Sequence, residues 1–217
     1  MGPAAGLLAA IVLGYLLGAI PFGVVVARLA GGQDPRHIGS QRTGATNAVR
    51  ALGMGWGVVV GLLDLAKGLV AAVIGAVIGS GVGLTPEWVA AGSCVAAVTG
   101  HIRSVFIGFR GGRGVATAAG GFLILVPAAL LFVIPIIGVV VVVTRFVSLG
   151  SIVGAASAPL VVAGLSWTGR ASLADVAYAT VVGLLIIAGH ADNITRLRSG
   201  TERRVGEART PVAGSDD

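Results

Sequence analysis

The sequence predicts an all-α polytopic membrane protein, and three observations lead to that prediction. Of the 217 residues, 55% are hydrophobic and only 11% are charged, whereas a soluble domain carries about 25% charged residues. The apolar residues form continuous runs rather than the alternating pattern of a membrane β-barrel. Glycines also recur four positions apart, a spacing that lets membrane helices approach closely. These pairs are Gly14/Gly18, Gly57/Gly61, Gly75/Gly79 and Gly150/Gly154.

The apolar runs give the elements in chain order. They cover residues 3–27 (interrupted only by Pro21), 56–78, 88–100, 114–143, 148–167 and 173–189. Between them lie an arginine-bearing loop (28–53), a Gly/Pro turn (79–87), a second arginine-bearing loop (101–113) and a short loop around Arg170. We expect residues 1–200 to form one membrane domain. We expect residues 201–217 to form a basic, then acidic tail without fixed structure.

The uncharged run 114–143 decides the topology, because it could be one tilted helix or two short helices divided at Pro127. Two helices give seven transmembrane spans, with the N-terminus outside and the C-terminus in the cytoplasm. All 15 basic residues except Lys67 and Arg170 then face the cytoplasm. A single helix would turn the basic tail outward. Since cytoplasmic loops carry the excess of Lys and Arg, the sequence predicts seven spans.

The net charge of +6 is therefore expected to contact anionic lipid headgroups and not nucleic acid. Cys94 is the only cysteine, which excludes an internal disulfide. We expect no metal site, because the three histidines lack carboxylate or thiol partners at metal-binding spacing. No basic residue precedes Arg28, so we do not expect a cleaved signal peptide.

The stretch from Phe109 to Thr117 predicts a phosphate cradle at the membrane rim. Glycines let successive N–H groups point into one concavity, a following helix adds its positive end, and arginine forks match phosphate oxygens. Alternatively, the glycines only allow close helix packing and the arginines only orient the spans. The predicted cradle residues are Arg110, Gly111, Gly112, Arg113, Gly114 and Thr117.

Two further polar segments leave the membrane on the same side. The loop 34–50 offers short hydrogen-bonding groups around glycines, which suits a polyol or phosphate, although Thr and Asn also begin helices. Its candidates are Ser40, Arg42, Gly44, Thr46, Asn47 and Arg50. After the last span, His190 and Asn193 share a helical face, and Ser148 leads another span from that side.

Asp64 and Lys67 stand apart from these loops, because they lie inside the second predicted span. Each charge near a bilayer centre costs about 2.5–3.5 kcal/mol on insertion scales. Their i, i+3 spacing places them on one helical face. We therefore predict a structural ion pair that faces inward and supports the site.

These motifs together resemble the bacterial acyl-phosphate:glycerol-3-phosphate acyltransferases (PlsY type). The matching pieces include Gly44-Ala45-Thr46-Asn47 with Arg50, the stretch Phe109 to Thr117, and His190 with Asn193. The resemblance implies seven helices in the bacterial plasma membrane and an active site at the cytoplasmic face. It implies transfer of a fatty acyl group from acyl-phosphate to the 1-hydroxyl of glycerol 3-phosphate, giving lysophosphatidic acid and phosphate, without a cofactor.

On this resemblance, Ser40, Arg110, His190 and Asn193 are the expected catalytic residues. Arg110 and Arg113 would hold one phosphate, while His190 and Asn193 would orient the glycerol phosphate. The other substrate- and phosphate-binding candidates are Arg42, Gly44, Thr46, Asn47, Arg50, Gly111, Gly112, Gly114, Thr117 and Ser148. A catalytically silent lipid- or phosphate-binding homologue and a small-anion transporter are the alternatives.

The chain departs from the family pattern at several positions. Arginine stands at 110 and 113 where lysine is usual, which keeps the charge. Gly189 replaces a basic residue, and Arg42 replaces a small amide. Arg42 either adds a donor fork for a phosphate or faces lipid headgroups, and we predict the inward orientation.

Overall fold

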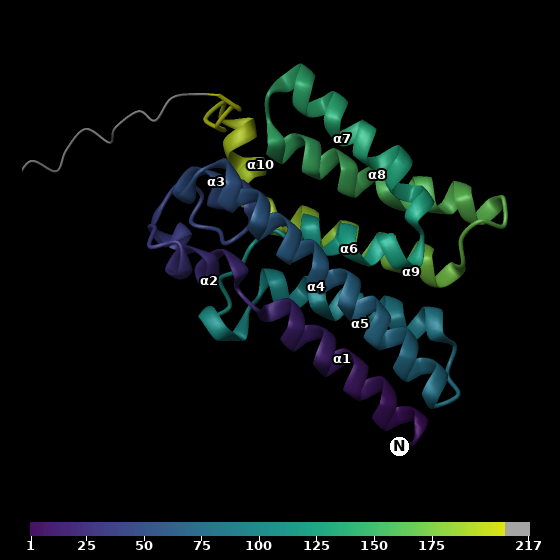
Figure 1. Ribbon diagram of the computed structural model, residues 1–217. Helices are drawn as coiled ribbons and strands as arrows, with labels where there is room; N and C mark the ends of the chain where they lie inside the picture. The colour runs from purple at the N-terminus through teal and green to yellow at the C-terminus, as the bar shows by residue number, and fades with distance from the viewer. Residues whose placement is uncertain (207–217) are drawn as a thin grey trace, which may run out of the picture.

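A computed structural model describes residues 1–206, and within them the chain is a bundle of α-helices with short 3-10 turns and no strand (Figure 1). The α-helices are α1 (Pro3–Ala19), α2 (Phe22–Leu29), α3 (Ala45–Leu52), α4 (Met54–Gly81), α5 (Pro86–Ile102), α6 (Val115–Leu125), α7 (Leu130–Thr144), α8 (Val147–Trp167), α9 (Leu173–Gly189) and α10 (Ala191–Arg198). The all-α prediction is confirmed.

Five helical segments of residues 1–206 are long and apolar enough to cross a membrane. They are Pro3–Leu29, Met54–Gly81, Pro86–Ile107, Pro127–Thr144 and Val147–Trp167. Helices α9 and α10, bent by 57° at His190, add a sixth if they count as one span, and α6 is a shorter apolar helix. The structure thus supports five or six spans, and only if α6 also crosses would the number reach the seven that the sequence predicts.

Proline divides the chain where the sequence pattern indicated. Pro127 begins a 3-10 turn between α6 and α7, so the run 114–143 forms two helices and not one. Pro21 likewise separates α1 from α2, because it cannot donate the backbone hydrogen bond that would continue α1. The loop 28–53 departs from the prediction, since its second part forms the short amphipathic helix α3.

Glycines set the close contacts between helices. A side chain at Gly18 would overlap the backbone carbonyl of Ala97 in α5, and one at Gly68 would overlap that of Thr117 in α6. Gly154 similarly packs on Ile137 across the α7–α8 interface. The expectation that small residues mediate helix packing is therefore confirmed.

The intramembrane ion pair is also confirmed. Lys67 Nζ lies 2.9 Å from Asp64 Oδ1, and both side chains are buried. Lys67 Nζ also donates to the carbonyl of Ile20 at 3.0 Å, where α1 ends before Pro21. The ammonium group thus forms an ion pair with a buried carboxylate and donates a hydrogen bond to a carbonyl at the helix break.

The arginine-bearing loops gather at one end of the bundle. Figure 1 shows α2, α3 and α10 together at the end opposite to the N-terminus of α1. The segment after α10 joins them, since Val205 exchanges hydrogen bonds with Arg145 at 2.7 and 2.8 Å. Residues 201–206 are mostly exposed, but Glu202 and Val205 contact the bundle. The expected tail without fixed structure stays a prediction. The rest of that predicted tail, 207–217, lies outside the described residues.

Candidate active site

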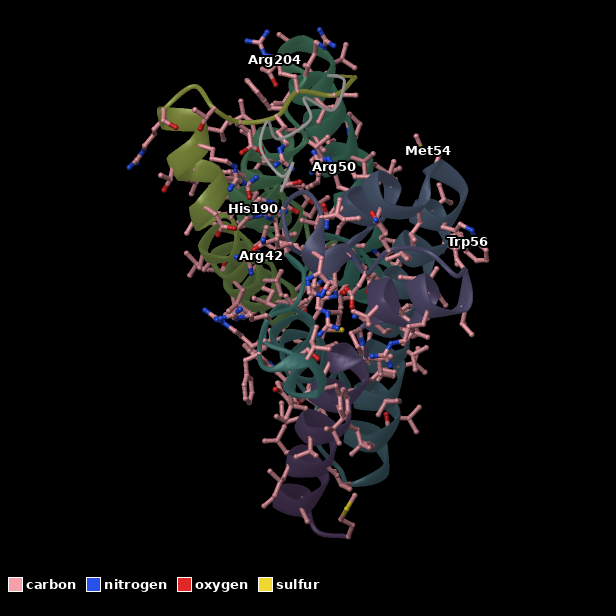
Figure 2. The ribbon with its side chains drawn as sticks, turned by 90° about the vertical axis from the view of Figure 1, so that its left-hand side faces the viewer. Arg42, Arg50, Met54, Trp56, His190 and Arg204 are labelled. Atoms are coloured by element: carbon pink, nitrogen blue, oxygen red, sulfur yellow. The ribbon has the colours of Figure 1, made fainter. Side chains whose placement is uncertain are left out.

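A cleft of about 430 Å³ opens at this polar end, and seven elements contribute to it. Its polar lining comes mostly from the predicted candidates: Ser40, Arg42, Gly44, Thr46, Asn47, Arg50, Arg113, Gly114, Ser148, His190 and Asn193. In Figure 2, Arg42, Arg50 and His190 lie at this end of the molecule, while Trp56 projects away from it. The apolar part of the lining includes Ala119, Ile134 and Ile137.

Four helices begin at the cleft. Their first residues or caps line it: Gly44 for α3, Gly114 for α6, Val147 for α8 and His190 for α10. In none of the four does the N-cap side chain accept a hydrogen bond from the first turn. Helix N-termini carry unpaired N–H groups and a partial positive charge, so their convergence favours an anion.

Side-chain charge favours an anion as well. Arginines 42, 50, 113, 196 and 203 line the cleft, and Asp64 and Glu202 are the carboxylates of its lining. Asp192 lies beside the lining and pairs with Arg42. Asp64 is already paired with Lys67. The cleft therefore holds an excess of fixed positive charge, the complement of a phosphate ester.

The cradle stretch 109–117 enters this cleft only in part. Arg113 and Gly114 line the cleft, but Arg110 is exposed and borders a separate concavity of about 780 Å³ beside Arg36 and His37. Thr117 is buried away from the cleft lining, with no hydrogen-bond partner for its hydroxyl among residues 1–206. Arg113 is thus the arginine of this stretch that reaches the predicted site.

The N–H groups of Gly111 and Gly112 already have backbone acceptors, which argues against their predicted anion-binding role. Gly111 N donates to the carbonyl of Ile102 at 3.1 Å, and Gly112 N donates to that of His101 at 3.0 Å. A side chain at Gly112 would also overlap the His101 ring. These glycines therefore fasten the loop to the end of α5, and their N–H groups are already used.

Asn47 organises the first loop. Its Nδ2 donates to the carbonyls of Pro35, Ile38 and Arg42 at 2.7–3.0 Å, and its Oδ1 accepts from Ser40 N at 3.0 Å. The amide is therefore fully engaged, and Asn47 shapes the loop rather than presenting free groups. The hydroxyl of Ser40 is buried with no hydrogen-bond partner among residues 1–206, which leaves it available to a ligand.

His190 ends α9 and is only 2% exposed. Its Nδ1 lies 2.8 Å from the carbonyl of Ile186, so Nδ1 carries the proton and Nε2 is the ring's acceptor. Burial, together with the positive charge of Arg113, lowers the pKa of His190 to about 4, although the hydrogen bond to Ile186 opposes the shift. The imidazole is consequently neutral at pH 7.

Glu202 was missed by sequence reasoning and is central to this end of the cleft. Its Oε1 accepts from Asn193 Nδ2 at 2.7 Å and from the Ser148 hydroxyl at 2.9 Å, and its Oε2 accepts from Arg196 at 2.7 Å. The Glu202 side chain is 7% exposed. Only its place directly after the His190–Arg198 motif could have suggested it.

Asp64 and His101 also line the cleft, although neither was a predicted site residue. His101 Nδ1 lies 3.4 Å from Asp64 Oδ1, which joins α5 to the ion pair in α4. The sequence singled out Asp64, because a charge inside a membrane span is costly. It could not reveal the contact with His101, which depends on how α4 and α5 pack. The network supports the loop that carries Arg113, because Gly112 lies against the His101 ring.

Arg42 lines the cleft, in agreement with the predicted inward orientation, but a carboxylate holds its guanidinium. Its Nη2 donates to the two carboxylate oxygens of Asp192 in α10, each at 3.0 Å, and its side chain is 27% exposed. Burial raises the pKa of Asp192, but the hydrogen bond and charge of Arg42 outweigh it, so the pKa is lowered. Arg42 therefore lines the cleft with its fork already paired.

Arg113 contrasts with Arg42. Its Nε and Nη2 are buried without a hydrogen-bond partner among residues 1–206. Burial, followed by the nearby charge of Arg42, lowers the pKa of Arg113 to about 10, which leaves it protonated at neutral pH. A buried cation with unpaired donors is costly, and a bound phosphate would satisfy it.

No three His, Cys, Asp or Glu side chains of residues 1–206 gather in a way that suits a metal ion. The fold defines a polytopic helical membrane protein, and the cleft at one end is a candidate site for an anion. The family model described as glycerol-3-phosphate acyltransferase matches residues 8–200. The chain belongs to the glycerol-3-phosphate acyltransferase family.

Curated relatives agree with this assignment. A glycerol-3-phosphate acyltransferase of Thermus thermophilus is 44% identical over 91% of this chain and 94% of the relative. One of Solidesulfovibrio magneticus is 45% identical over 89% and 92% of the respective chains. A crystal structure of PlsY (YgiH), an integral membrane glycerol 3-phosphate acyltransferase in its glycerol 3-phosphate form, matches with a TM-score of 0.81 and 39% identity, covering 92% of this chain and 96% of that one.

Proposed function

We propose that this protein transfers a fatty acyl group from acyl-phosphate to the 1-hydroxyl of glycerol 3-phosphate, giving lysophosphatidic acid and phosphate. The observation that carries the proposal is the guanidinium of Arg113 before the N-terminus of α6, whose buried Nε and Nη2 have no hydrogen-bond partner among residues 1–206. The surrounding arginines and helix N-termini suit the phosphate groups of both substrates. The matched relatives bear the name of this activity.

Each side chain has a role in this proposal. Arg113 and Arg50 hold phosphate oxygens, and the free hydroxyl of Ser40 contacts a polar substrate group. His190 accepts a hydrogen bond from the acceptor hydroxyl through Nε2, and Asn193 orients the glycerol phosphate. Arg110 lies outside the cleft lining, so its positive charge attracts the anionic substrates from a distance and does not contact them in the cleft.

The reaction needs no covalent enzyme intermediate, because phosphate is a good leaving group. The 1-oxygen of glycerol 3-phosphate attacks the acyl carbon, the acyl–phosphate C–O bond breaks, and the hydroxyl proton ends on the released phosphate. The protein accelerates the reaction in two ways: it places the two substrates together, and it stabilises the charge on the departing phosphate. The neutral imidazole of His190 can relay the proton.

We also propose the topology and location. Seven spans arise if α6 and α9 cross together with the five long segments, with the N-terminus outside and α10 in the cytoplasm. The arginine-bearing loops then face the cytoplasm, as the distribution of basic residues in membrane proteins favours. The membrane is the bacterial plasma membrane, and the apolar lining around Ile134 and Ile137 faces the acyl chain.

The test is an assay of the purified full chain in lipid vesicles. We expect phosphate release from acyl-phosphate that depends on glycerol 3-phosphate, with lysophosphatidic acid formed in equal amount. Binding of glycerol 3-phosphate without turnover would indicate a silent homologue. Uptake of glycerol 3-phosphate without phosphate release would indicate a transporter.

A further inference from the structure

The carboxylate of Asp192 lies between two guanidinium groups. Arg42 Nη2 donates to both of its oxygens at 3.0 Å, while Arg113 Nη2 lies 3.9 Å from Oδ2. The first distance is a charge-assisted hydrogen bond, and the second is too long for a hydrogen bond. Asp192 is therefore held by Arg42 and only attracted by Arg113.

This arrangement matters because Arg113 has donors to offer a ligand. Its Nε and Nη2 are buried and have no hydrogen-bond partner among residues 1–206. Asp192 would need to move by only about 1 Å to reach the distance of an N–H···O bond. A carboxylate that did so would occupy donors that a substrate phosphate requires.

We infer that Arg42 is a positioning residue that holds the Asp192 carboxylate away from Arg113 and so keeps the Arg113 fork free for a substrate phosphate. The inference rests on the proposed function for the identity of the ligand. It gives Arg42 a role that acts through Asp192, not through direct contact with the substrate. Arg42 also ties the first loop to α10, since it lies 150 positions before its partner.

The inference predicts an unusual pattern of mutant effects. Arg42→Gln frees Asp192 to pair with Arg113, and we expect about a tenfold weaker affinity for the phosphate ester that Arg113 binds. Adding Asp192→Asn removes the competing charge, so the double variant recovers most of that affinity. A merely structural ion pair would instead leave the double variant as impaired as the single variants.

A matched control exists on the same loop. Arg36 pairs with Asp34 at 2.6 Å, but neither residue lines the cleft. Arg36→Gln thus removes a comparable surface ion pair without affecting Asp192, and we expect unchanged affinity. Arg42→Lys keeps a positive charge beside Asp192 and should retain most of the affinity, which controls for misfolding.

The experiment measures binding of glycerol 3-phosphate to the detergent-purified full chain, by ligand-induced thermal stabilisation, and KM for both substrates in vesicles. A rise in KM for one substrate alone identifies whose phosphate Arg113 holds, with kcat changing less. Unchanged binding and KM in Arg42→Gln, or a double variant no better than Arg42→Gln, would overturn the inference. Because binding is measured without turnover, an inactive wild type would count against the proposed function alone.

Discussion

The carboxylate of Glu202 accepts a 2.9 Å hydrogen bond from the hydroxyl of Ser148, which lies 54 positions earlier in the chain. The contact fastens the segment after α10 to the beginning of α8. Since Glu202 also accepts from Asn193 and Arg196, a single carboxylate fixes three polar side chains that line the cleft. The orientation of the predicted site residue Asn193 thus depends on a residue outside the predicted site.

Glu202→Ala should destabilise the folded protein, because it leaves three buried or half-buried donors unpaired. Leaving a buried polar group unsatisfied costs about 1–3 kcal/mol. Glu202→Gln keeps one acceptor oxygen, so its stability should lie between that of Glu202→Ala and that of the wild type. The measurement is the thermal unfolding midpoint in detergent, with Glu87→Ala, at an exposed position of α5, as the control. Equal midpoints for Glu202→Ala and Glu87→Ala would refute the prediction.

Arg113→Ala should lower kcat/KM at least about a hundredfold, because a charge-assisted bidentate contact to a transferring group is lost. Arg110→Ala, three positions earlier on the exposed side, should have a clearly smaller effect. The measurement is the kcat/KM of both variants and the wild type in lipid vesicles. If Arg110→Ala is the more damaging change, the original expectation of a catalytic Arg110 is correct and the assignment to Arg113 is not.

The buried His190 predicts how stability depends on pH. Its pKa is about 4 in the folded protein and about 6.5 in an unfolded chain. Between these values the unfolded state binds more protons, so the folded protein loses stability as the pH falls from 6.5 to 4. His190→Asn should weaken this loss.

The check is the unfolding midpoint of wild type and His190→Asn measured at intervals from pH 7 to pH 4. The difference between the two proteins should shift in favour of the variant as the pH falls. Parallel curves would show that His190 does not titrate as the structure indicates.

The topology prediction concerns the two ends of the bundle. Single cysteines at Thr85, before α5, and at Ser199, after α10, are both at exposed positions. In intact cells an impermeant thiol reagent should label the first position and not the second, while Cys94 is buried. Labelling of both positions, or of Ser199→Cys alone, would contradict the proposed orientation.

The sequence predicted most of the fold because each signal was local. Apolar runs gave the long helices, glycine pairs gave close contacts, and Pro127 divided the longest run, as the structure has it. Similar reasoning gathered Ser40, Arg113 and His190 into one site, since each flanked an apolar run on the same predicted side.

What failed depended on contacts between distant segments. The N–H groups of Gly111 and Gly112 looked free, but the end of α5 supplies their acceptors. The fork of Arg42 looked available, but Asp192 lies 150 positions away in sequence and adjacent in space. Glu202 and His101 were missed for the same reason, because no spacing in the chain reveals which helix ends meet.

The short helix α6 has a consequence for the depth at which the proposed chemistry takes place. Its 11 residues rise about 16 Å, roughly half of a 30 Å hydrocarbon core. In the proposed seven-span topology α6 crosses the membrane, so a helix this short either thins the bilayer locally or holds its N-terminus below the plane of the headgroups. In the second case glycerol 3-phosphate would reach the acyl carbon below the headgroups, while the acyl chain stays in the lipid. The activity would then depend on the thickness of the bilayer as well as on the substrates.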